Sequence, residues 1–291
     1  MEKREWKLAR RALPFGERTL LMGVLNVTPD SFSDGGRFFS KEQALARAEE
    51  MIAEGADILD VGGESTRPGG VPVPAEEELR RVIPVVEHLA KNSMIPISVD
   101  TTKAVVARAA LDSGAEIIND ISALRFDYHI ADEVARGRAG LVLMHSRGTP
   151  ATMHRLPPVA DVLGDVTNGL RRSISMAERR GVARESIALD PGIGFGKSQE
   201  QNVELIARLD ELAGRFPGFP VIIGTSRKSF IGRLLDDAPV EERVYGTMAT
   251  ITAAVLLGAH VVRVHDVRAA LESVRVADAI KRAVRRTSES L

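Results

Sequence analysis

Residues 20–36 read LLMGVLNVTPDSFSDGG, an apolar run that turns abruptly polar after Leu25. The first part has the composition of a strand that is buried on both faces. Such strands are typical of parallel sheets covered by helices on both sides. The second part, from Asn26 to Gly35-Gly36, supplies hydrogen-bonding side chains and a glycine hinge. It predicts a hinged loop at the end of a strand, the arrangement expected of a lid over a site.

The pattern of an apolar run with a polar end returns seven more times along the chain. The further runs cover residues 57–62, 95–100, 115–120, 140–145, 186–191, 220–225 and 260–266. Helical patterns lie between them at Lys41–Glu54, Glu76–Lys91, Thr102–Ser113, Val159–Arg180, Glu200–Leu212, Val240–Leu257 and Val267–Arg286. Buried strands that alternate with helices predict an α/β fold, a single (β/α)₈ barrel with its active site at the C-terminal ends of the strands. An open doubly wound sheet is the alternative, but Gly192–Gly196 lacks the spacing of a dinucleotide fingerprint.

The composition restricts the class of protein further. The chain has 291 residues, a net charge of −1 and no cysteine. The near-neutral charge gives no reason to expect a nucleic acid or membrane surface as partner, and the lack of cysteine excludes disulfides and thiolate catalysis. No apolar run reaches the ~20 residues of a membrane span. We expect a cytoplasmic protein in which residues 1–291 form one domain, with residues 1–18 as an N-terminal cap over the barrel bottom.

The predicted strands end in chemically active residues, namely Asn26, Asp60, Asp100, Asn119, His145, Asp190, Gly224 with Lys228, and Arg263 with His265. In a closed barrel all these ends open on one face. Asp100, Asn119 and Asp190 would suit a flat heterocycle rich in N–H donors, because each carboxylate accepts several hydrogen bonds. Arg263 and His265 share one face of a strand, and with Asn26 they favour a phosphate or pyrophosphate.

Seven motifs in this order resemble the dihydropteroate synthase family of the folate pathway: NVTPDSFSDGG, DVGGESTRPG, SVDTT, NDI, LDPGIGFGK, TSRKSFIG and RVHDV. The resemblance runs from Leu20 to Val267. It implies a (β/α)₈ barrel that joins 6-hydroxymethyl-7,8-dihydropterin pyrophosphate to para-aminobenzoate, releasing pyrophosphate and forming 7,8-dihydropteroate. It also implies Mg²⁺ as cofactor and inhibition by sulfonamides, which mimic aminobenzoate.

The resemblance implies a role for each matching residue. The pterin ring would meet Asp100, Asn119, Met144, Asp190, Gly224 and Lys228. The pyrophosphate would meet Asn26, Arg67, Arg263 and His265, with Asn26 also binding Mg²⁺. The aminobenzoate would meet Thr66, Pro68, Phe195 and Ser229. Asp34, Thr66, Arg67 and Lys228 would act in catalysis, Asp34 lying near the developing positive charge. Where many family members read Met-His-Met-Gln-Gly, this chain departs with Ser146-Arg147.

Other interpretations remain open at this stage. A methyltetrahydrofolate-binding methyltransferase resembles this barrel, and a catalytically silent pterin-binding paralogue would share its pocket. Asp60 would either orient the loop at Thr66-Arg67 or serve structure alone. Lys197 is either exposed or part of the site, and His145 is either a ligand or a packed strand-end residue.

An association is also predicted. Tyr245–Leu257 contains no charged residue, so its outer face would form an apolar patch unless neighbouring segments of the same chain cover it. The alternative is a homodimer packed through this helix, with Ala254 in the interface, and through Val267–Arg286. The family is commonly dimeric through its later helices, which favours the homodimer.

Overall fold

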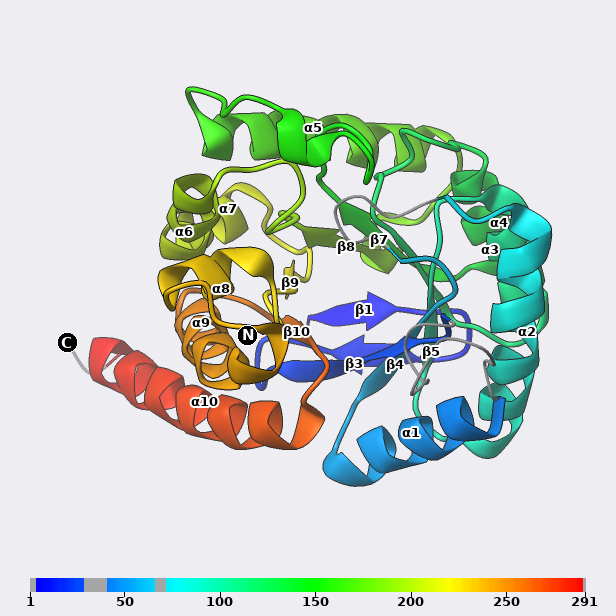
Figure 1. Ribbon diagram of the computed structural model, residues 1–291, viewed down its shortest axis with the longest axis horizontal. Helices are drawn as coiled ribbons and strands as arrows, with labels where there is room; N and C mark the ends of the chain where they lie inside the picture. The colour runs from blue at the N-terminus through cyan, green and yellow to red at the C-terminus, as the bar shows by residue number, and fades with distance from the viewer. Residues whose placement is uncertain (1–3, 29–40, 66–71, 290–291) are drawn as a thin grey trace.

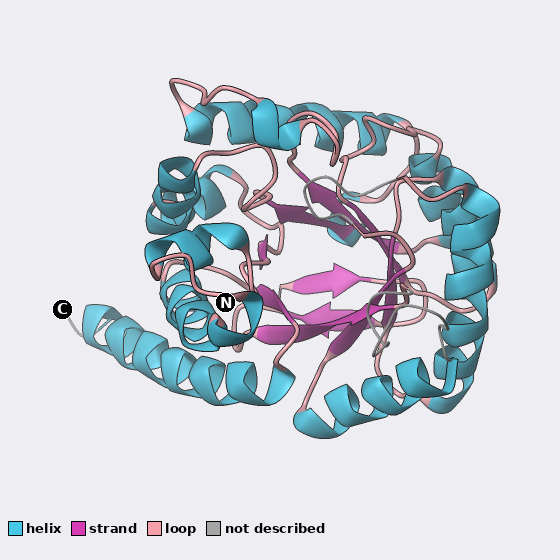
Figure 2. Cartoon of the chain, viewed as in Figure 1, coloured by secondary structure: helices cyan, strands magenta, loops and turns pink. Residues whose placement is uncertain are grey.

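The computed structural model describes residues 4–28, 41–65 and 72–289, with side chains described as far as Val284. Its centre is a sheet of eight parallel strands in the order β8-β7-β6-β5-β4-β3-β10-β9. The strands are β3 (Leu20–Asn26), β4 (Ile58–Gly62), β5 (Ile97–Asp100), β6 (Ile117–Asp120), β7 (Gly140–Met144), β8 (Ile187–Asp190), β9 (Ile222–Ile223) and β10 (Val261–Val264). The edge strands also meet, because Leu189 bridges Val221 and its amide donates to the Pro220 carbonyl at 2.9 Å. The sheet therefore closes, and the predicted barrel is confirmed (Figure 2).

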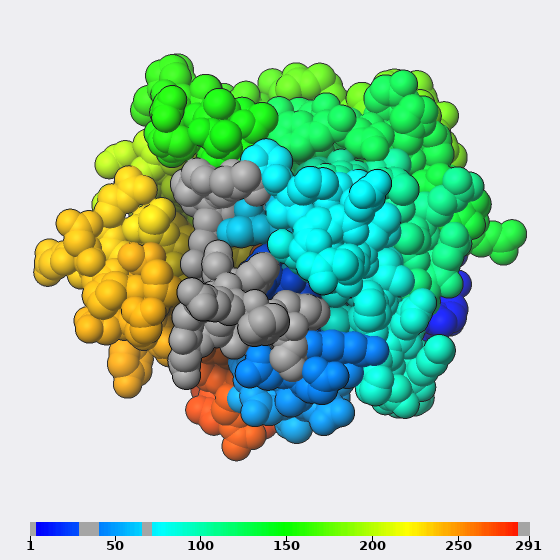
Figure 3. All heavy atoms as spheres, turned by 45° about the vertical axis from the view of Figure 1, so that its right-hand side comes forward, coloured from blue at the N-terminus to red at the C-terminus, as the bar shows by residue number. Residues whose placement is uncertain are grey.

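Helices surround this barrel (Figure 1). They are α1 (Lys41–Glu54), α2 (Ala75–Asn92), α3 (Ala104–Asp112), α4 (Ile130–Gly137), α5 (Val162–Arg179), α6 (Gln199–Ala207), α7 (Leu209–Arg215), α8 (Ser229–Leu234), α9 (Val244–Leu256) and α10 (Val267–Glu289). In the space-filling view α1 is flanked by α2 and α10, so the ring closes between its first and last helices (Figure 3). Within the described ranges, no helix combines the length and apolar character needed to cross a membrane.

Two helical segments differ from the sequence prediction. The pattern analysis missed α4, whose eight residues give too few turns for a clear period. The segment Glu200–Leu212 was expected as one helix, but it breaks at Arg208 between α6 and α7. The break turns the chain so that Leu209 and Leu212 are buried in the core.

An N-terminal hairpin covers the bottom of the barrel. It consists of β1 (Glu5–Lys7) and β2 (Ala12–Pro14), which pair antiparallel. Trp6 is fully buried, and its indole N–H donates to the Ser186 carbonyl at 2.9 Å. It packs with Leu8, Phe15 and the inward-facing residues of the lower strands, namely Leu20, Met22, Ile58, Ile117, Val142, Ala188, Ile222 and Val261. The lower half of the barrel is therefore an apolar core, which leaves the upper end for polar side chains.

The uncharged helix α9 does not present Ala254 to solvent. Ala254 and Ile251 are fully buried against the barrel, so the prediction that Ala254 lies in an interface is wrong. The outer face of α9 instead exposes Tyr245 and Leu256. A helix without charges gives no polar stripe from which its outward side could be identified.

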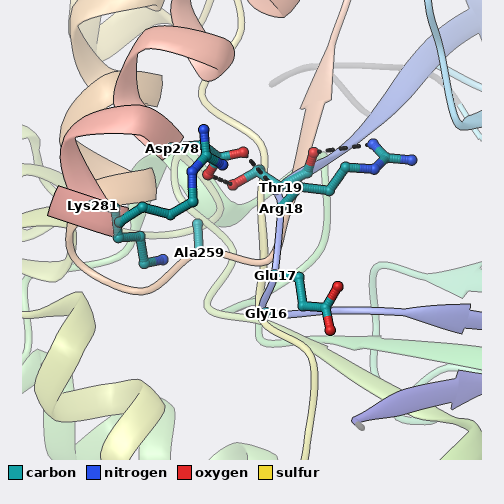
Figure 4. A pocket seen from close by; sticks show the side chains of 8 residues that line it. Gly16, Glu17, Arg18, Thr19, Ala259, Asp278 and Lys281 are labelled. Atoms are coloured by element: carbon teal, nitrogen blue, oxygen red, sulfur yellow. Dashed lines mark hydrogen bonds between the residues drawn. The ribbon is translucent and has the colours of Figure 1, made fainter. Parts of the chain in front are cut away.

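The first barrel strand is tied to the last helix at the lower end of the molecule. Asp278 of α10 is buried and accepts hydrogen bonds from the amide and the hydroxyl of Thr19, both at 2.9 Å. Beside it, Arg18 forms a bidentate pair with Asp57 at 2.8 and 2.6 Å. Figure 4 shows Arg18, Thr19 and Asp278 around a small pocket at the N-terminal end of β3. Asp278 thus holds the chain where it enters the barrel.

We predict that Asp278→Ala destabilises the fold. The substitution leaves the buried Thr19 amide without its acceptor, which should cost about 1–3 kcal/mol. Urea unfolding should show a lower midpoint with an unchanged slope. Glu272→Ala, an exposed position on the same helix, should leave the midpoint nearly unchanged. Equal midpoints for Asp278→Ala and wild type would contradict this assignment.

Candidate active site

Polar side chains line the upper end of the barrel because strand residues alternate in direction. In β4, Ile58 belongs to the inner apolar cluster, so Asp60 and Gly62 also face inward. The pairing register then places Gly62 beside Asp100, and Asp100 beside Asn119. On the opposite wall the register pairs Met144 with Asp190. We call the group Asn26, Asp60, Asp100, Asn119, Asp190, Lys228 and Arg263 the polar rim.

Arg263 lies at the centre of the polar rim. Its Nε donates to Asp60 Oδ2 at 2.6 Å, and its Nη2 donates to Asp100 Oδ2 at 2.8 Å. Asp60 Oδ2 also accepts from Asn119 Nδ2 at 3.0 Å. Burial alone would lower the pKa of Arg263, but the charges of Asp60 and Asp100 outweigh it and raise the pKa. The guanidinium therefore stays charged and joins two walls of the barrel.

The two carboxylates predicted to bind a ring are both buried and held differently. Burial raises the pKa of Asp100 to about 8, although the charge of Arg263 opposes this shift. Burial also raises the pKa of Asp190, whereas Lys228 lowers it, and Asp190 Oδ1 accepts from the Gly192 amide at 2.6 Å. A carboxylate with a raised pKa is poorly solvated as an anion. Ligand N–H groups would supply the hydrogen bonds that stabilise the charged form.

Lys228 bridges the polar rim and an aromatic neighbour. Its ammonium donates to the Ile193 carbonyl and lies 4.7 Å from the centroid of the Phe195 ring. A Cβ on Gly194, whose φ is +84°, would come within 3.0 Å of Lys228 Cδ. The glycine therefore permits the close approach of this side chain to the turn after β8. Burial lowers the pKa of Lys228 to about 8, with Asp190 opposing the shift.

Lys197 is partly buried and its ammonium is held by the protein, which favours the site over a solvent-exposed position. Its ammonium donates to three carbonyls, those of His145 at 3.2 Å, Gly192 at 2.8 Å and Phe195 at 3.2 Å. Burial lowers its pKa to about 7, while the charge of Asp190 opposes the shift. Lys197 thus connects the turn after β8, which carries Phe195, to His145 at the end of β7.

His145 belongs with the packed residues. Burial lowers its pKa to about 2, and the nearby cation of Lys197 adds to this, so the ring is neutral. Its Nε2 lies 3.5 Å from Asp165 Oδ2 on α5. A Cβ on Gly169 of the same helix would collide with the ring at 2.4 Å. These contacts place the ring of His145 against α5.

The turn after β9 is held by side chains of α9 and of the segment after β10, and it contacts His265. The Thr225 hydroxyl accepts a hydrogen bond from the Thr250 hydroxyl at 2.9 Å, and Arg227, with φ +59°, pairs with Asp266 through two nitrogens. The Ser226 hydroxyl oxygen lies 2.9 Å from His265 Nδ1 and accepts from the His265 amide at 3.2 Å. His265 is therefore oriented from the turn that also carries Lys228.

Asn26 and Gly224 complete the predicted set around these groups. A Cβ on Gly62 would lie 3.7 Å from Asn26 Oδ1 and 3.6 Å from Asp100 Cβ, so Asn26 adjoins the carboxylate wall. A Cβ on Gly224 would lie 3.7 Å from Arg263 Cβ and 3.9 Å from Lys228 Nζ. Ser229 is exposed at the start of α8, beyond the buried positions.

Ser146 and Arg147, which depart from the family pattern, form hydrogen bonds that connect neighbouring loops. The Ser146 hydroxyl donates to the Ile121 carbonyl at 2.8 Å and accepts from Arg125 Nη2 at 2.7 Å. Arg147 Nη1 donates to the carbonyls of Pro157 and Gly196 at 2.9 and 3.0 Å. The departure thus supports the turn that carries Phe195 from outside.

The structure brings most of the predicted residues to one end of the barrel. Those that it places there are Asn26, Asp100, Asn119, Met144, Asp190, Phe195, Gly224, Lys228, Arg263 and His265. The predicted residues Asp34, Thr66, Arg67 and Pro68 lie outside the described residues. Sequence reasoning missed the contact of Asp60 with Arg263 and Asn119. The alternation in DILDVG indicates only that Asp60 faces inward with Ile58, because its partners come from other strands.

The comparisons with known proteins agree with this geometry. Residues 22–265 match the family model described as pterin binding enzyme. The dihydropteroate synthase of Synechocystis sp. is 48% identical over 268 residues, which is 92% of each chain. The Yersinia pestis dihydropteroate synthase in complex with a sulfonamide drug gives a TM-score of 0.89 at 39% identity, covering 95% of this chain and 99% of that one. The Burkholderia cenocepacia dihydropteroate synthase complexed with 7,8-dihydropteroate gives a TM-score of 0.86 at 42% identity, covering 98% and 99%. The chain therefore belongs to the pterin-binding enzyme family, among its dihydropteroate synthases.

Proposed function

We propose that this protein condenses 6-hydroxymethyl-7,8-dihydropterin pyrophosphate with para-aminobenzoate to give 7,8-dihydropteroate and pyrophosphate. The observation that carries the proposal is the position of Arg263. One partly buried guanidinium contacts Asp100, an acceptor suited to a pterin, and lies on the strand that leads to His265 in the anion corner. The relative solved with 7,8-dihydropteroate, at 42% identity over nearly the whole chain, supports the same reaction.

The pterin would lie against the carboxylate wall. Its N–H groups would donate to Asp100 and Asp190, whose buried anions lack solvent, and Asn119 would complete the recognition of the ring edge. Met144 would contribute apolar contact, and Gly224 would allow close approach. Lys228 would leave the Ile193 carbonyl to donate to the ring, while its aliphatic stem stays beside Phe195.

The pyrophosphate would bind at Asn26, Arg263 and His265, together with Arg67. Asn26 is our candidate ligand for Mg²⁺, because a side-chain amide oxygen belongs to the ligand class that this ion prefers. One protein ligand suffices where substrate phosphates and waters complete the coordination. When bound, the ion would offset negative charge on the departing pyrophosphate.

The reaction would be an ionisation-like substitution at the exocyclic methylene. The carbon–oxygen bond to pyrophosphate breaks, and the electron pair leaves with the pyrophosphate. The positive charge spreads into the pterin, where Asp100, Asp190 and Asp34 would stabilise it. The aminobenzoate nitrogen then forms the new carbon–nitrogen bond and loses a proton. Water would trap the cation, so we propose that the segment from Asn26 to Gly36, of which residues 29–36 lie outside the described residues, closes over the site during reaction.

The aminobenzoate would lie between Phe195, Ser229 and the loop residues Thr66 and Pro68. Because the loop at Thr66-Arg67 would close over an occupied anion site, we propose that aminobenzoate binds after the pterin substrate. A silent pterin-binding paralogue should carry changed residues in its loops, whereas Asn26, Arg67 and Lys228 are all present in this sequence. A methyltetrahydrofolate-binding methyltransferase would need neither the pyrophosphate corner nor the Lys228 turn.

The most direct test of the function is release of pyrophosphate from both substrates with Mg²⁺ present. We expect release that depends on aminobenzoate, and loss of that release in Asp100→Ala and Asp190→Ala. Each variant removes a buried acceptor worth about 1–3 kcal/mol or more to an N–H-rich ring. Hydrolysis that proceeds equally without aminobenzoate, or no release at all, would exclude the synthase.

We predict that kcat/KM for the pterin substrate falls at high pH, as Lys228 loses its proton, and falls at low pH, as Asp100 gains one. The pKa of Lys228 is lowered to about 8, so the charged donor is present below that pH and lost above it. Lys228→Arg should move the alkaline limb upward, because a guanidinium stays charged over this range. Lys228→Met should remove the limb together with most of the activity, with the fold intact. An unchanged limb in Lys228→Arg would assign it to another group.

We also propose a cytoplasmic homodimer, packed through α9 and α10. In α10 the apolar residues Val276, Ile280 and Val284 are 61%, 46% and 61% exposed and recur every four positions, so they form one stripe. Tyr245, 87% exposed, lies on the neighbouring helix α9, which packs on α10. An apolar stripe of this kind is typical of a helix that packs against a second protein surface.

We predict that Ile280→Asp converts the dimer to a monomer. The substitution would bury a charge in an apolar interface, which sedimentation at micromolar concentration would detect. Val105→Asp, at a 53% exposed position on α3, should leave the dimer intact. A wild-type protein that sediments at the 31.5 kDa of one chain would contradict the dimer.

A further inference from the structure

Asp60 occupies an unusual position inside the barrel. It is fully buried, one layer of side chains below Gly62 and Asp100, and its register partners are Val24 and Ser98. The other inward residue of the same strand, Ile58, belongs to the apolar core. Asp60 is therefore the lowest carboxylate of the polar rim, directly above the apolar lower core.

The two oxygens of Asp60 are used unequally. Oδ2 accepts from Arg263 Nε at 2.6 Å and from Asn119 Nδ2 at 3.0 Å. Oδ1 is buried and has no hydrogen-bond partner among the described residues, and the same holds for the hydroxyl of Ser98 beside it. A buried polar atom without a partner costs stability. The unpaired Oδ1 lowers the stability of the fold, whereas Oδ2 accepts hydrogen bonds from Arg263 and Asn119.

The charges around Arg263 also indicate that Asp60 is not needed for stability. Arg263 also contacts Asp100 at 2.8 Å, so its guanidinium remains paired without Asp60. Buried ion pairs contribute little to stability compared with apolar residues of similar size. The specific effect of Asp60 is geometric, because it fixes the direction of the guanidinium at Nε and the orientation of the Asn119 amide.

We infer that Asp60 is the positioning residue of this site. It holds Arg263, which would bind the pyrophosphate, and the Asn119 amide, which would bind the pterin, in fixed positions relative to each other. The inference rests on the proposed function, since it assigns those two ligands to Arg263 and Asn119. Asp60 itself touches neither substrate. It acts through the two side chains that share its Oδ2, so it couples the halves of the site.

Three variants separate position from charge. Asp60→Ala removes both hydrogen bonds and should lower kcat/KM for the pterin substrate about 100-fold, as small misplacements of binding groups do. Asp60→Asn removes the charge but keeps a carbonyl oxygen that can accept from the same two donors. It should therefore recover to within about tenfold of wild type. Equal losses in the Ala and Asn variants would show that charge, and not position, is required.

Asp57→Ala provides the matched control. Asp57 directly precedes the same strand and pairs with Arg18 at 2.6 and 2.8 Å, but at the far end of the barrel. It should lose stability, because the Leu21 amide and Arg18 lose their acceptor, while keeping wild-type kcat/KM. If the activity of both variants simply follows their melting temperatures, Asp60 is only structural.

A double-mutant cycle tests whether Asp60 acts through Arg263. In an Arg263→Met background, Asp60→Ala should lower kcat/KM by a smaller factor than it does in wild type, because one of the two groups that it positions is gone and only Asn119 remains. If the fold-loss in kcat/KM of the double variant equals the product of the losses of the two single variants, the inference is overturned. Calorimetric binding of Mg²⁺-pyrophosphate gives a readout independent of turnover, and Asp60→Ala should weaken it where Asp57→Ala does not. If wild type binds pyrophosphate but forms no dihydropteroate, the proposed function fails while this test still stands.

Discussion

The guanidinium of Arg263, held between Asp60 and Asp100, is the interaction on which the site depends. Two carboxylates that face one closed space would repel each other, and burial raises the pKa of Asp100. A single permanent cation keeps them within reach of one another and inside the barrel. The same cation faces the end of the barrel where an anionic leaving group would bind. The Arg263 guanidinium would thus take part in the recognition of both the pterin ring and its pyrophosphate.

The barrel makes this arrangement possible by separating its two ends. Below, Trp6 and the inner ring of apolar side chains exclude water and fix the strands. Above, the same inward positions two residues further along become polar, as Ile58 gives way to Asp60 and Ile117 to Asn119. The turn after β8 is then held from two sides, by Lys228 on the Ile193 carbonyl and by Lys197 on three others. The substrate-facing groups therefore rest on fixed elements.

The sequence predicted the strands, the closed barrel and the residues at the strand ends, because buried parallel strands and their polar ends have a clear pattern. It did not predict α4, which is too short for a helical period, or the inward direction of Ala254, because α9 has no polar face. The partners of Lys197 and Asp60 also could not be predicted. They are carbonyls and side chains from other strands, and only closure of the barrel brings them together.

The pterin and pyrophosphate subsites of this site would share one partly buried cation, Arg263. The most direct measurement is the calorimetric affinity of the wild-type protein for Mg²⁺-pyrophosphate, with and without saturating 6-hydroxymethylpterin. A ring that donates to Asp100 would release Arg263 from part of its pairing. The account therefore predicts at least about fivefold tighter pyrophosphate binding with the pterin present, a coupling in the range usual for linked sites. Equal affinities under both conditions would contradict it.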